Sequence, residues 1–102
     1  MRVIKPKTVR EYAEQYPDAH DPLLLWLKAA RAADWNDLLE VRKTYPHADA
    51  VSVASGNIVN VFNVRGNRYR LIVAIKYEWA MVYVLRFLTH ADYNKDKWKE
   101  QP

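Results

Sequence analysis

The chain has 102 residues, half of them hydrophobic, which favours one domain over residues 1–102 with a single compact core. It contains no cysteine, so disulfide scaffolds and thiolate zinc sites are excluded. It also lacks an apolar leader and any run of about 18 apolar residues that could span a bilayer, so we expect a soluble, cytoplasmic protein.

The positive charge is confined to the last third of the chain. The net charge is +4, and residues 65–102 hold eight Lys/Arg against four Asp/Glu, whereas residues 1–64 hold eight of each. A localised positive field favours a polyanionic partner such as nucleic acid. The alternative is that residues such as Lys97 and Lys99 only keep the protein soluble.

Helical patterns fill the first half. The Thr-x-x-Glu sequence of residues 8–11 has the form of a capping box and predicts a helix that Pro17 closes, with one face formed by Val9, Tyr12, Ala13 and Tyr16. A second helix is predicted from Asp21-Pro22, with a buried stripe of Leu23, Trp26, Leu27 and Ala30. A third is predicted from Asp34 to a point before Pro46, with Trp35, Leu38, Leu39 and Arg42 at helical spacing. Because Ala32-Ala33 offers no clear break, the last two can also form one bent helix.

Strand patterns fill the second half. A short edge strand is predicted at residues 50–53, followed by strands at residues 58–64, 67–77 (the longest) and 81–89, and a short final helix within residues 90–98. Arg65-Gly66 suits a two-residue hairpin loop, since glycine adopts positive φ without steric cost. We therefore predict an α+β domain, with two or three N-terminal helices packed on one face of an antiparallel β-meander.

The hairpin gathers three arginines. A two-residue loop would place Asn63 opposite Arg68 and Val61 opposite Arg70, so that both arginines share one face of the sheet. Two neighbouring guanidinium groups become favourable when an anion sits between them, and their planar fork suits phosphate oxygens. The alternative is that they are solvated and cover apolar surface. The position inside a strand favours a functional role for Arg70, whereas Arg65 and Arg68 are evenly balanced.

A second cluster of polar residues follows the last predicted strand. On a helix, His90 and Tyr93 lie on the same side, and Lys95 joins them only if the turn is irregular. Histidine carries protons near neutral pH, and a tyrosine ring can stack on a base. The alternative, which the residues alone slightly favour, is that Thr89 or His90 only caps the helix and Tyr93 buries its ring. No histidine or carboxylate cluster has the spacing of metal ligands, so we predict no metal site.

Two segments carry a resemblance to a known family. The sequences "FNVRGNRYRLIVAI" (residues 62–75) and "VYVLRFLTHADYNK" (residues 82–95) resemble the HigB-type toxins of bacterial toxin–antitoxin systems, within the RelE/ParE superfamily. The pattern "W..L..V...YP.AD" over residues 35–49 fits the same family in layout. By motif position, the matching residues are Asn63, Asn67, Arg70, His90, Tyr93 and Lys95. Arg65 and Arg68 fall at variable positions, and Asn94 stands where the family commonly has Asp.

The resemblance implies a fold, an activity and a partner. The fold is a compact α+β domain, and the activity is that of an mRNA interferase, an endoribonuclease that cuts messenger RNA, usually on the translating ribosome, without a metal or other cofactor. The partner is a HigA-type helix-turn-helix antitoxin. The candidate catalytic residues are Arg70, His90, Tyr93 and Lys95. The candidate RNA-binding residues are Asn63 and Asn67, which match the family motif, together with the basic residues Arg65, Arg68 and Arg86 of the positively charged last third.

These residue types suit cleavage of RNA by its own 2′-hydroxyl. Arg70 would stabilise the charged transition state, His90 or Lys95 would carry a proton, and Tyr93 would orient or stack the substrate. Two alternatives remain: a non-enzymatic poison of DNA gyrase, as in the ParE branch of the superfamily, and a plain nucleic-acid-binding module. The His–Tyr pair favours the ribonuclease, because a docking surface needs no proton carrier.

Overall fold

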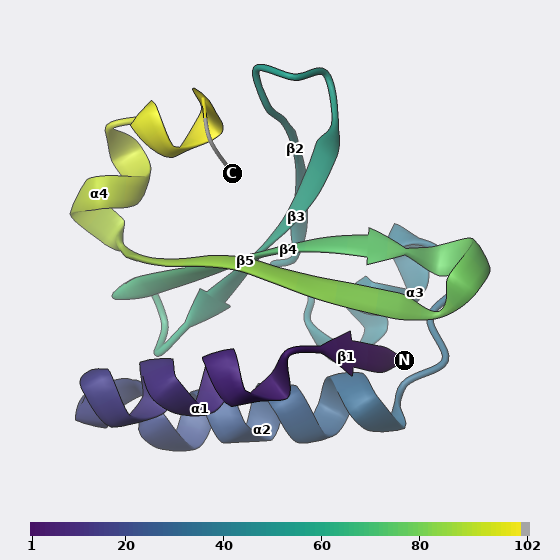
Figure 1. The fold of residues 1–102 in the computed structure, drawn as a ribbon, viewed down its shortest axis with the longest axis horizontal. Helices are drawn as coiled ribbons and strands as arrows, with labels where there is room; N and C mark the ends of the chain where they lie inside the picture. Colours follow the sequence, from purple (N-terminus) through teal and green to yellow (C-terminus); the bar gives the residue numbers. More distant parts are fainter. Residues whose placement is uncertain (101–102) are drawn as a thin grey trace.

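A computed structural model describes residues 1–100, and Figure 1 shows its arrangement. Five strands form one sheet: β1 (Arg2–Ile4), β2 (Asp49–Ser52), β3 (Ile58–Val64), β4 (Tyr69–Lys76) and β5 (Met81–Thr89). The α-helices are α1 (Pro6–Gln15), α2 (His20–Ala32), α3 (Leu38–Thr44) and α4 (His90–Asn94). The remaining elements of residues 1–100 are three 3-10 helices: η1 (Pro17–Ala19), η2 (Tyr77–Trp79) and η3 (Lys97–Glu100). The predicted α+β class is confirmed.

The sheet is mixed, which corrects the prediction of a purely antiparallel meander. Its strand order is β1-β5-β4-β3-β2, and β1 runs parallel to β5 while the other neighbours are antiparallel. No strand is predicted at β1, because three residues are too few to display the alternation of a strand. Long-range pairing forms it instead, with Val3 opposite Val82.

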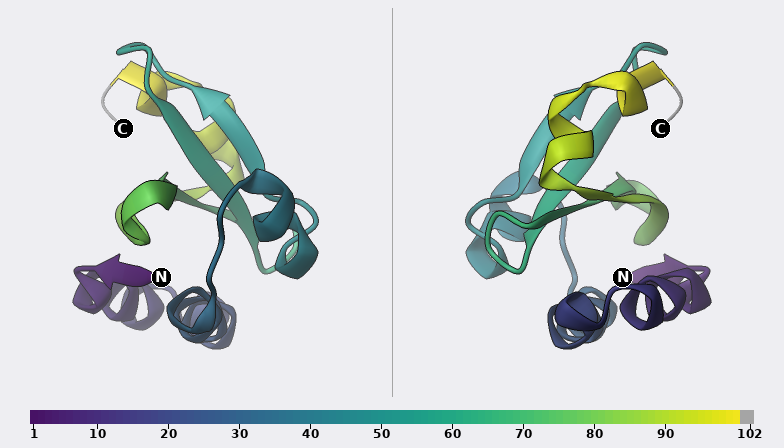
Figure 2. Two further views of the ribbon diagram at one scale, coloured as in Figure 1. Left: turned by 90° about the vertical axis from the view of Figure 1, so that its right-hand side faces the viewer. Right: turned by 90° about the vertical axis from the view of Figure 1, so that its left-hand side faces the viewer.

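Helices cover both faces of the sheet, although unequally. The side views in Figure 2 show α1 and α2 on one side and α4 with η3 on the other. The larger core lies under α1 and α2 and includes the fully buried side chains of Leu23, Trp26, Phe62 and Leu71. A smaller core lies on the opposite face, and its buried members are Val53, Val59, Val61, Ile72 and Trp98. The predicted packing of the N-terminal helices on one face is therefore correct, and a second, smaller core supports the C-terminal segment.

The helix boundaries differ from the prediction at their N-termini. Helix α1 begins at Pro6, and its N-cap residue is Lys5 in the left-handed conformation, so the predicted capping box at residues 8–11 is wrong. Proline is favoured at the first helical position, which explains the earlier start. Helix α2 begins at His20, one residue before the predicted start, and its predicted stripe is buried.

Helix α3 is separate from α2, so the alternative of one bent helix is wrong. It begins at Leu38 rather than Asp34, because the Asp37 side chain caps it by accepting a hydrogen bond from the Glu40 amide at 2.9 Å. Trp35 lies in the loop before α3 and its side chain is buried, whereas Leu39 on the helix is exposed. The helical spacing of these apolar residues therefore predicted a helix longer than α3.

The β3–β4 hairpin has a four-residue loop, which corrects the predicted register. Asn63 pairs with Arg70 and Val64 pairs with Tyr69, so residues 65–68 form the loop. Gly66 and Arg65 both have positive φ, at 62° and 53°. Arg68 therefore lies in the loop and not in the strand, and the longest strand is β5 rather than β4.

Candidate functional site

Arg70 is the centre of the site. It lies near the start of β4 on the face opposite α1 and α2, and only 9% of its surface is exposed. Nη1 donates to the Tyr69 carbonyl at 3.0 Å, and Nη2 lies 3.4 Å from Asn67 Oδ1 and 3.2 Å from His90 Nδ1. All three acceptors are uncharged. Among residues 1–100, no carboxylate forms an ion pair with Arg70.

His90 joins the C-terminal segment to this guanidinium. Thr89 caps α4 through a hydrogen bond from the Asp92 amide at 3.2 Å, so His90 is the first residue of the helix. The His90 amide donates to the Arg68 carbonyl at 2.8 Å, which ties the helix to the hairpin loop. The exposed imidazole then reaches Arg70 with Nδ1, while Nε2 lies 3.0 Å from the side-chain amide of Asn94.

The Tyr93 ring packs against the guanidinium group of Arg70. The guanidinium carbon lies 5.5 Å from the centre of the Tyr93 ring, a cation–π distance. The ring stacks on Trp98 at 5.2 Å, and the Trp98 indole N–H donates to the Tyr93 carbonyl at 3.0 Å. Burial raises the pKa of the Tyr93 hydroxyl above its ordinary value, so the phenol stays protonated at neutral pH. The site thus contains a cation, an imidazole and a neutral phenol.

The other two arginines of the hairpin face a different partner. Arg68 Nη1 donates to Asp18 Oδ2 at 3.0 Å, and Arg65 Nη1 donates to the Asp18 carbonyl at 3.0 Å. Tyr69 donates to the same carboxylate at 2.7 Å. The Tyr69 hydrogen bond and then the Arg68 hydrogen bond hold the pKa of Asp18 below its ordinary value. The expectation that Arg68 and Arg70 share one face is therefore wrong, because the longer loop turns Arg68 toward η1.

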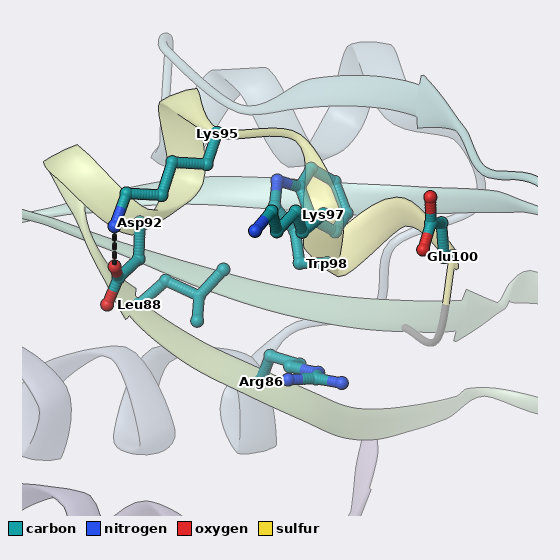
Figure 3. A pocket seen from close by; sticks show the side chains of 7 residues that line it. All are labelled: Arg86, Leu88, Asp92, Lys95, Lys97, Trp98 and Glu100. Atoms are coloured by element: carbon teal, nitrogen blue, oxygen red, sulfur yellow. Dashed lines mark hydrogen bonds and ion pairs between the residues drawn. The ribbon is translucent and has the colours of Figure 1, made fainter.

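Lys95 lies in a cavity beside the Arg70 cluster. The cavity has a volume of about 510 Å³ and is lined by Arg86, Leu88, Asp92, Lys95, Lys97, Trp98 and Glu100. Figure 3 shows Lys95 reaching back to Asp92, whose carboxylate is 3.5 Å from the ammonium nitrogen. Leu88 pairs with Arg70 across the β4–β5 ladder, which places the cavity next to the guanidinium. The structure thus brings Lys95 into the neighbourhood of the site, with its ammonium directed to Asp92.

The remaining predicted residues lie around the same centre. Asn63 is the cross-strand partner of Arg70, so the two side chains project to one face. Asn67 accepts from Arg70, and Arg86 lies on β5 opposite Ile72, next to a register shift in the β4–β5 ladder. The structure therefore brings Asn67, Arg70, His90 and Tyr93 into contact, with Asn63 beside Arg70 in the β3–β4 ladder and Arg86 and Lys95 in the adjoining cavity. Arg65 and Arg68 are the two that it directs elsewhere.

Three residues of the neighbourhood escaped the sequence analysis as site residues. Asn94 follows His90 by four positions, a helical spacing that could have revealed it. Trp98 supports Tyr93 from beyond the end of α4, and only the presence of a tryptophan in a polar tail signals it. Asp18 lies about fifty positions away from the arginines that it binds, and no local pattern connects them.

Four findings bear on the class of protein to which this chain belongs. Within residues 1–100 no helix combines the length and apolar character needed to cross a membrane, and no three His, Asp or Glu side chains are grouped so that they could hold a metal ion. No curated protein sequence matches the chain. The profile of one protein family, described as HigB_toxin, RelE-like toxic component of a toxin-antitoxin system, matches residues 19–96. That match spans most of the chain, from α2 through α4, and so this protein belongs to the HigB toxin family.

Proposed function

We propose that this toxin is an endoribonuclease that cleaves messenger RNA on the translating ribosome, without a metal ion. As the toxic component of a toxin–antitoxin system, it has an antitoxin as its partner. We further propose that this antitoxin is a helix-turn-helix protein of the HigA type and that the toxin acts in the cytoplasm.

The observation that carries the proposal is the buried guanidinium of Arg70, which has no carboxylate counter-ion among residues 1–100. A buried charge is costly unless an opposite charge or strong hydrogen bonds compensate it. Arg70 has five N–H donors, and its three hydrogen bonds within residues 1–100 go to neutral acceptors and leave two donors for a ligand. A phosphate would supply both the missing charge and the missing acceptors, with the bidentate geometry that arginine favours.

The chemistry would proceed by attack of a ribose 2′-oxygen on the adjacent phosphorus. The 2′-hydroxyl gives its proton to a base as the new O–P bond forms, and the bond from phosphorus to the 5′-oxygen then breaks. The departing 5′-oxygen takes up a proton, leaving a 2′,3′-cyclic phosphate and a 5′-hydroxyl. Arg70 stabilises the negative charge of the intermediate, and such stabilisation is usually a large contribution to catalysis.

His90 is the favoured proton carrier, and Lys95 is the alternative. The His90 imidazole contacts the same guanidinium that would bind the phosphate, whereas the Lys95 ammonium is directed to Asp92. Tyr93 would present its ring to a base and its protonated hydroxyl to the substrate. The cationic side chains of the adjoining cavity, together with Asn63 and Asn67, would bind the flanking nucleotides.

The test compares single variants for growth inhibition and for transcript cleavage during induced expression. We expect Arg70→Ala to reduce cleavage by about 10²- to 10³-fold, because the transition state loses its cation. We expect His90→Ala to reduce it by about 10²- to 10⁴-fold, as for other acid–base groups. Arg10→Ala is the matched control, since Arg10 is exposed on α1 and lies on the helical side of the molecule.

The same measurements distinguish the ribonuclease from a gyrase poison and from a simple nucleic-acid-binding module. Thermal unfolding of each variant shows whether a loss of activity comes from a loss of fold, which matters for the buried Arg70. Full toxicity of both folded variants would contradict the proposed site. Arrest of replication with DNA breaks and intact transcripts would indicate a gyrase poison, and normal growth with salt-dependent nucleic-acid binding would indicate a simple binding module.

A further inference from the structure

The imidazole of His90 is held at both nitrogens by groups of different kinds. Nδ1 lies 3.2 Å from Arg70 Nη2, and Nε2 lies 3.0 Å from Asn94 Nδ2. A guanidinium group can only donate, so Nδ1 must accept and cannot carry a proton in this contact. The neutral ring therefore carries its proton on Nε2.

Asn94 must then present an acceptor to Nε2. The nitrogen and oxygen of a side-chain amide exchange places by a half-turn, and the partners decide between the two orientations. With Nε2 protonated, the favourable orientation is the one that places Asn94 Oδ1 against it. One ring thus links Arg70 to Asn94 through two hydrogen bonds that run in the same direction.

We propose that Asn94 is a positioning residue that holds His90 with its proton on Nε2, so that Nδ1 is the nitrogen that accepts the substrate proton. This inference deepens the proposed RNA cleavage and rests on it. When a phosphate oxygen replaces Nδ1 as the acceptor of Arg70, the Nδ1 lone pair becomes available beside the bound phosphate. The contact to Asn94 keeps the ring in place during this exchange.

The neutrality of Asn94 has a chemical consequence. A carboxylate at this position would also accept from Nε2, but it would favour the imidazolium form of His90. An imidazolium would direct an N–H at Arg70, so two donors and two positive charges would meet and the contact would be lost. A neutral amide accepts the same hydrogen bond without favouring the charged ring.

The other charged groups around His90 are mostly paired with one another. Arg70 on β4 is the only cation whose side chain contacts the ring among residues 1–100. The nearby pairs are Arg68 with Asp18 from the hairpin, Asp92 with Lys95 on α4, and Lys99 with Asp96 from the end of the chain. Lys97 and Arg86 line the adjoining cavity. The direct partners that set the protonation of His90 are thus Arg70 and Asn94.

The experiment uses the full chain and two variants of the same residue. Asn94→Ala removes the acceptor, and Asn94→Asp keeps it while adding a charge. Nitrogen NMR of the His90 ring identifies the protonated nitrogen and follows its titration, and single-turnover cleavage of messenger RNA bound to ribosomes is measured across the same pH range. Ala91→Asp is the control, because it adds the same charge to the exposed surface of α4 without a hydrogen bond to His90.

The wild-type ring should carry its proton on Nε2 at neutral pH. We expect Asn94→Ala to lower the cleavage rate by about 10- to 100-fold, as do changes in partners that orient metal-bound histidines. Asn94→Asp should retain the rate at high pH, while its His90 titration and the acid limb of its rate profile move up by about one pH unit. The shift with Ala91→Asp should be smaller.

Two results would overturn the inference: a proton on Nδ1 in the wild-type protein at neutral pH, or an unchanged His90 titration in both Asn94 variants. Unchanged cleavage in Asn94→Ala would also overturn it. The NMR titration involves no RNA, so a protein that shows the expected ring behaviour but cleaves no RNA would contradict the proposed function and not the assignment of the ring.

Discussion

The two faces of the sheet bury residues of different kinds at adjacent positions of β4. Leu71 is fully buried in the larger core beneath α1 and α2, whereas Arg70, one position earlier, is buried on the opposite face among uncharged acceptors. The first face is closed by two long helices, and the second only by the short α4 and η3. We infer that stability resides mainly on the helical face, and that the other face can therefore hold a buried charge that has no ion-pair partner among residues 1–100.

The largest expected effect lies on the helical face. Phe62 is 1% exposed, and its ring contacts those of Trp26, Trp35 and Tyr45 at 5.4 to 6.3 Å. We expect Phe62→Ala to lower the free energy of unfolding by about 3–5 kcal/mol, since it removes the ring and leaves a cavity. Urea unfolding measures the loss, and Phe62→Leu should lose less. A loss of less than about 1 kcal/mol for Phe62→Ala would contradict the inference that stability resides mainly on the helical face.

A smaller loss of stability and a larger loss of activity are expected on the other face. Trp98 is 4% exposed, and it supports the Tyr93 ring beneath Arg70. We expect Trp98→Ala to cost about 3 kcal/mol and Trp98→Phe about 1 kcal/mol, the latter for the lost hydrogen bond to the Tyr93 carbonyl. Cleavage by the folded fraction should fall with Trp98→Ala. If only stability changes, the smaller core has no role in positioning the site.

Much of the fold could be predicted from the sequence, because its strands and helices have clear local patterns of apolar residues. The bounds of β3 and β5 follow from runs of β-branched and aromatic residues, and the buried stripe of α2 follows from its helical spacing. The family resemblance singled out Arg70, His90 and Tyr93, and the contacts show these side chains together, while their roles in cleavage stay predictions. These features depend on near neighbours in sequence or on a motif that spans two adjacent strands.

The features that escaped prediction depend on distant parts of the chain. Strand β1 exists through its pairing with β5, and no three-residue pattern can signal such a partner. The four-residue hairpin loop allows Arg68 to reach Asp18, a contact between residues fifty positions apart, which a local assignment of turn type could not foresee. The length of a loop decided the direction of a side chain, and with it the separation of Arg68 from Arg70.

A pH-dependent change in stability is expected at Asp18, which joins η1 to the β3–β4 hairpin. The hydrogen bonds from Tyr69 and Arg68 lower the pKa of Asp18 in the folded protein, so its contribution to stability is present above the unfolded pKa of about 4 and is lost as the pH falls through the folded value. Asp18→Asn should therefore be less stable than the wild type at neutral pH, and the two should converge in strongly acid solution. Thermal unfolding at several pH values measures this difference.

A matched control sharpens the Asp18 prediction. Asp21→Asn removes one negative charge from the exposed start of α2, where the carboxylate lies 2.9 Å from the Nδ1 of His20. Its melting temperature should stay close to that of the wild type at neutral pH. An equal loss in both variants would mean that net charge, and not the contacts of Asp18 with the hairpin, is responsible.

The smallest effect is expected at Lys95, within the site's own neighbourhood. Its ammonium pairs with Asp92 at 3.5 Å on the surface, where such pairs contribute about 0–1 kcal/mol. Lys95→Ala should leave the unfolding free energy nearly unchanged, and it should weaken RNA binding while retaining most of the cleavage rate at saturating RNA. Lys97→Ala, which removes a second cation from the same cavity, should behave similarly. A drop of Lys95→Ala to the level of His90→Ala would transfer the proton-carrying role to Lys95, because loss of one of several cations in a cavity cannot abolish the chemical step.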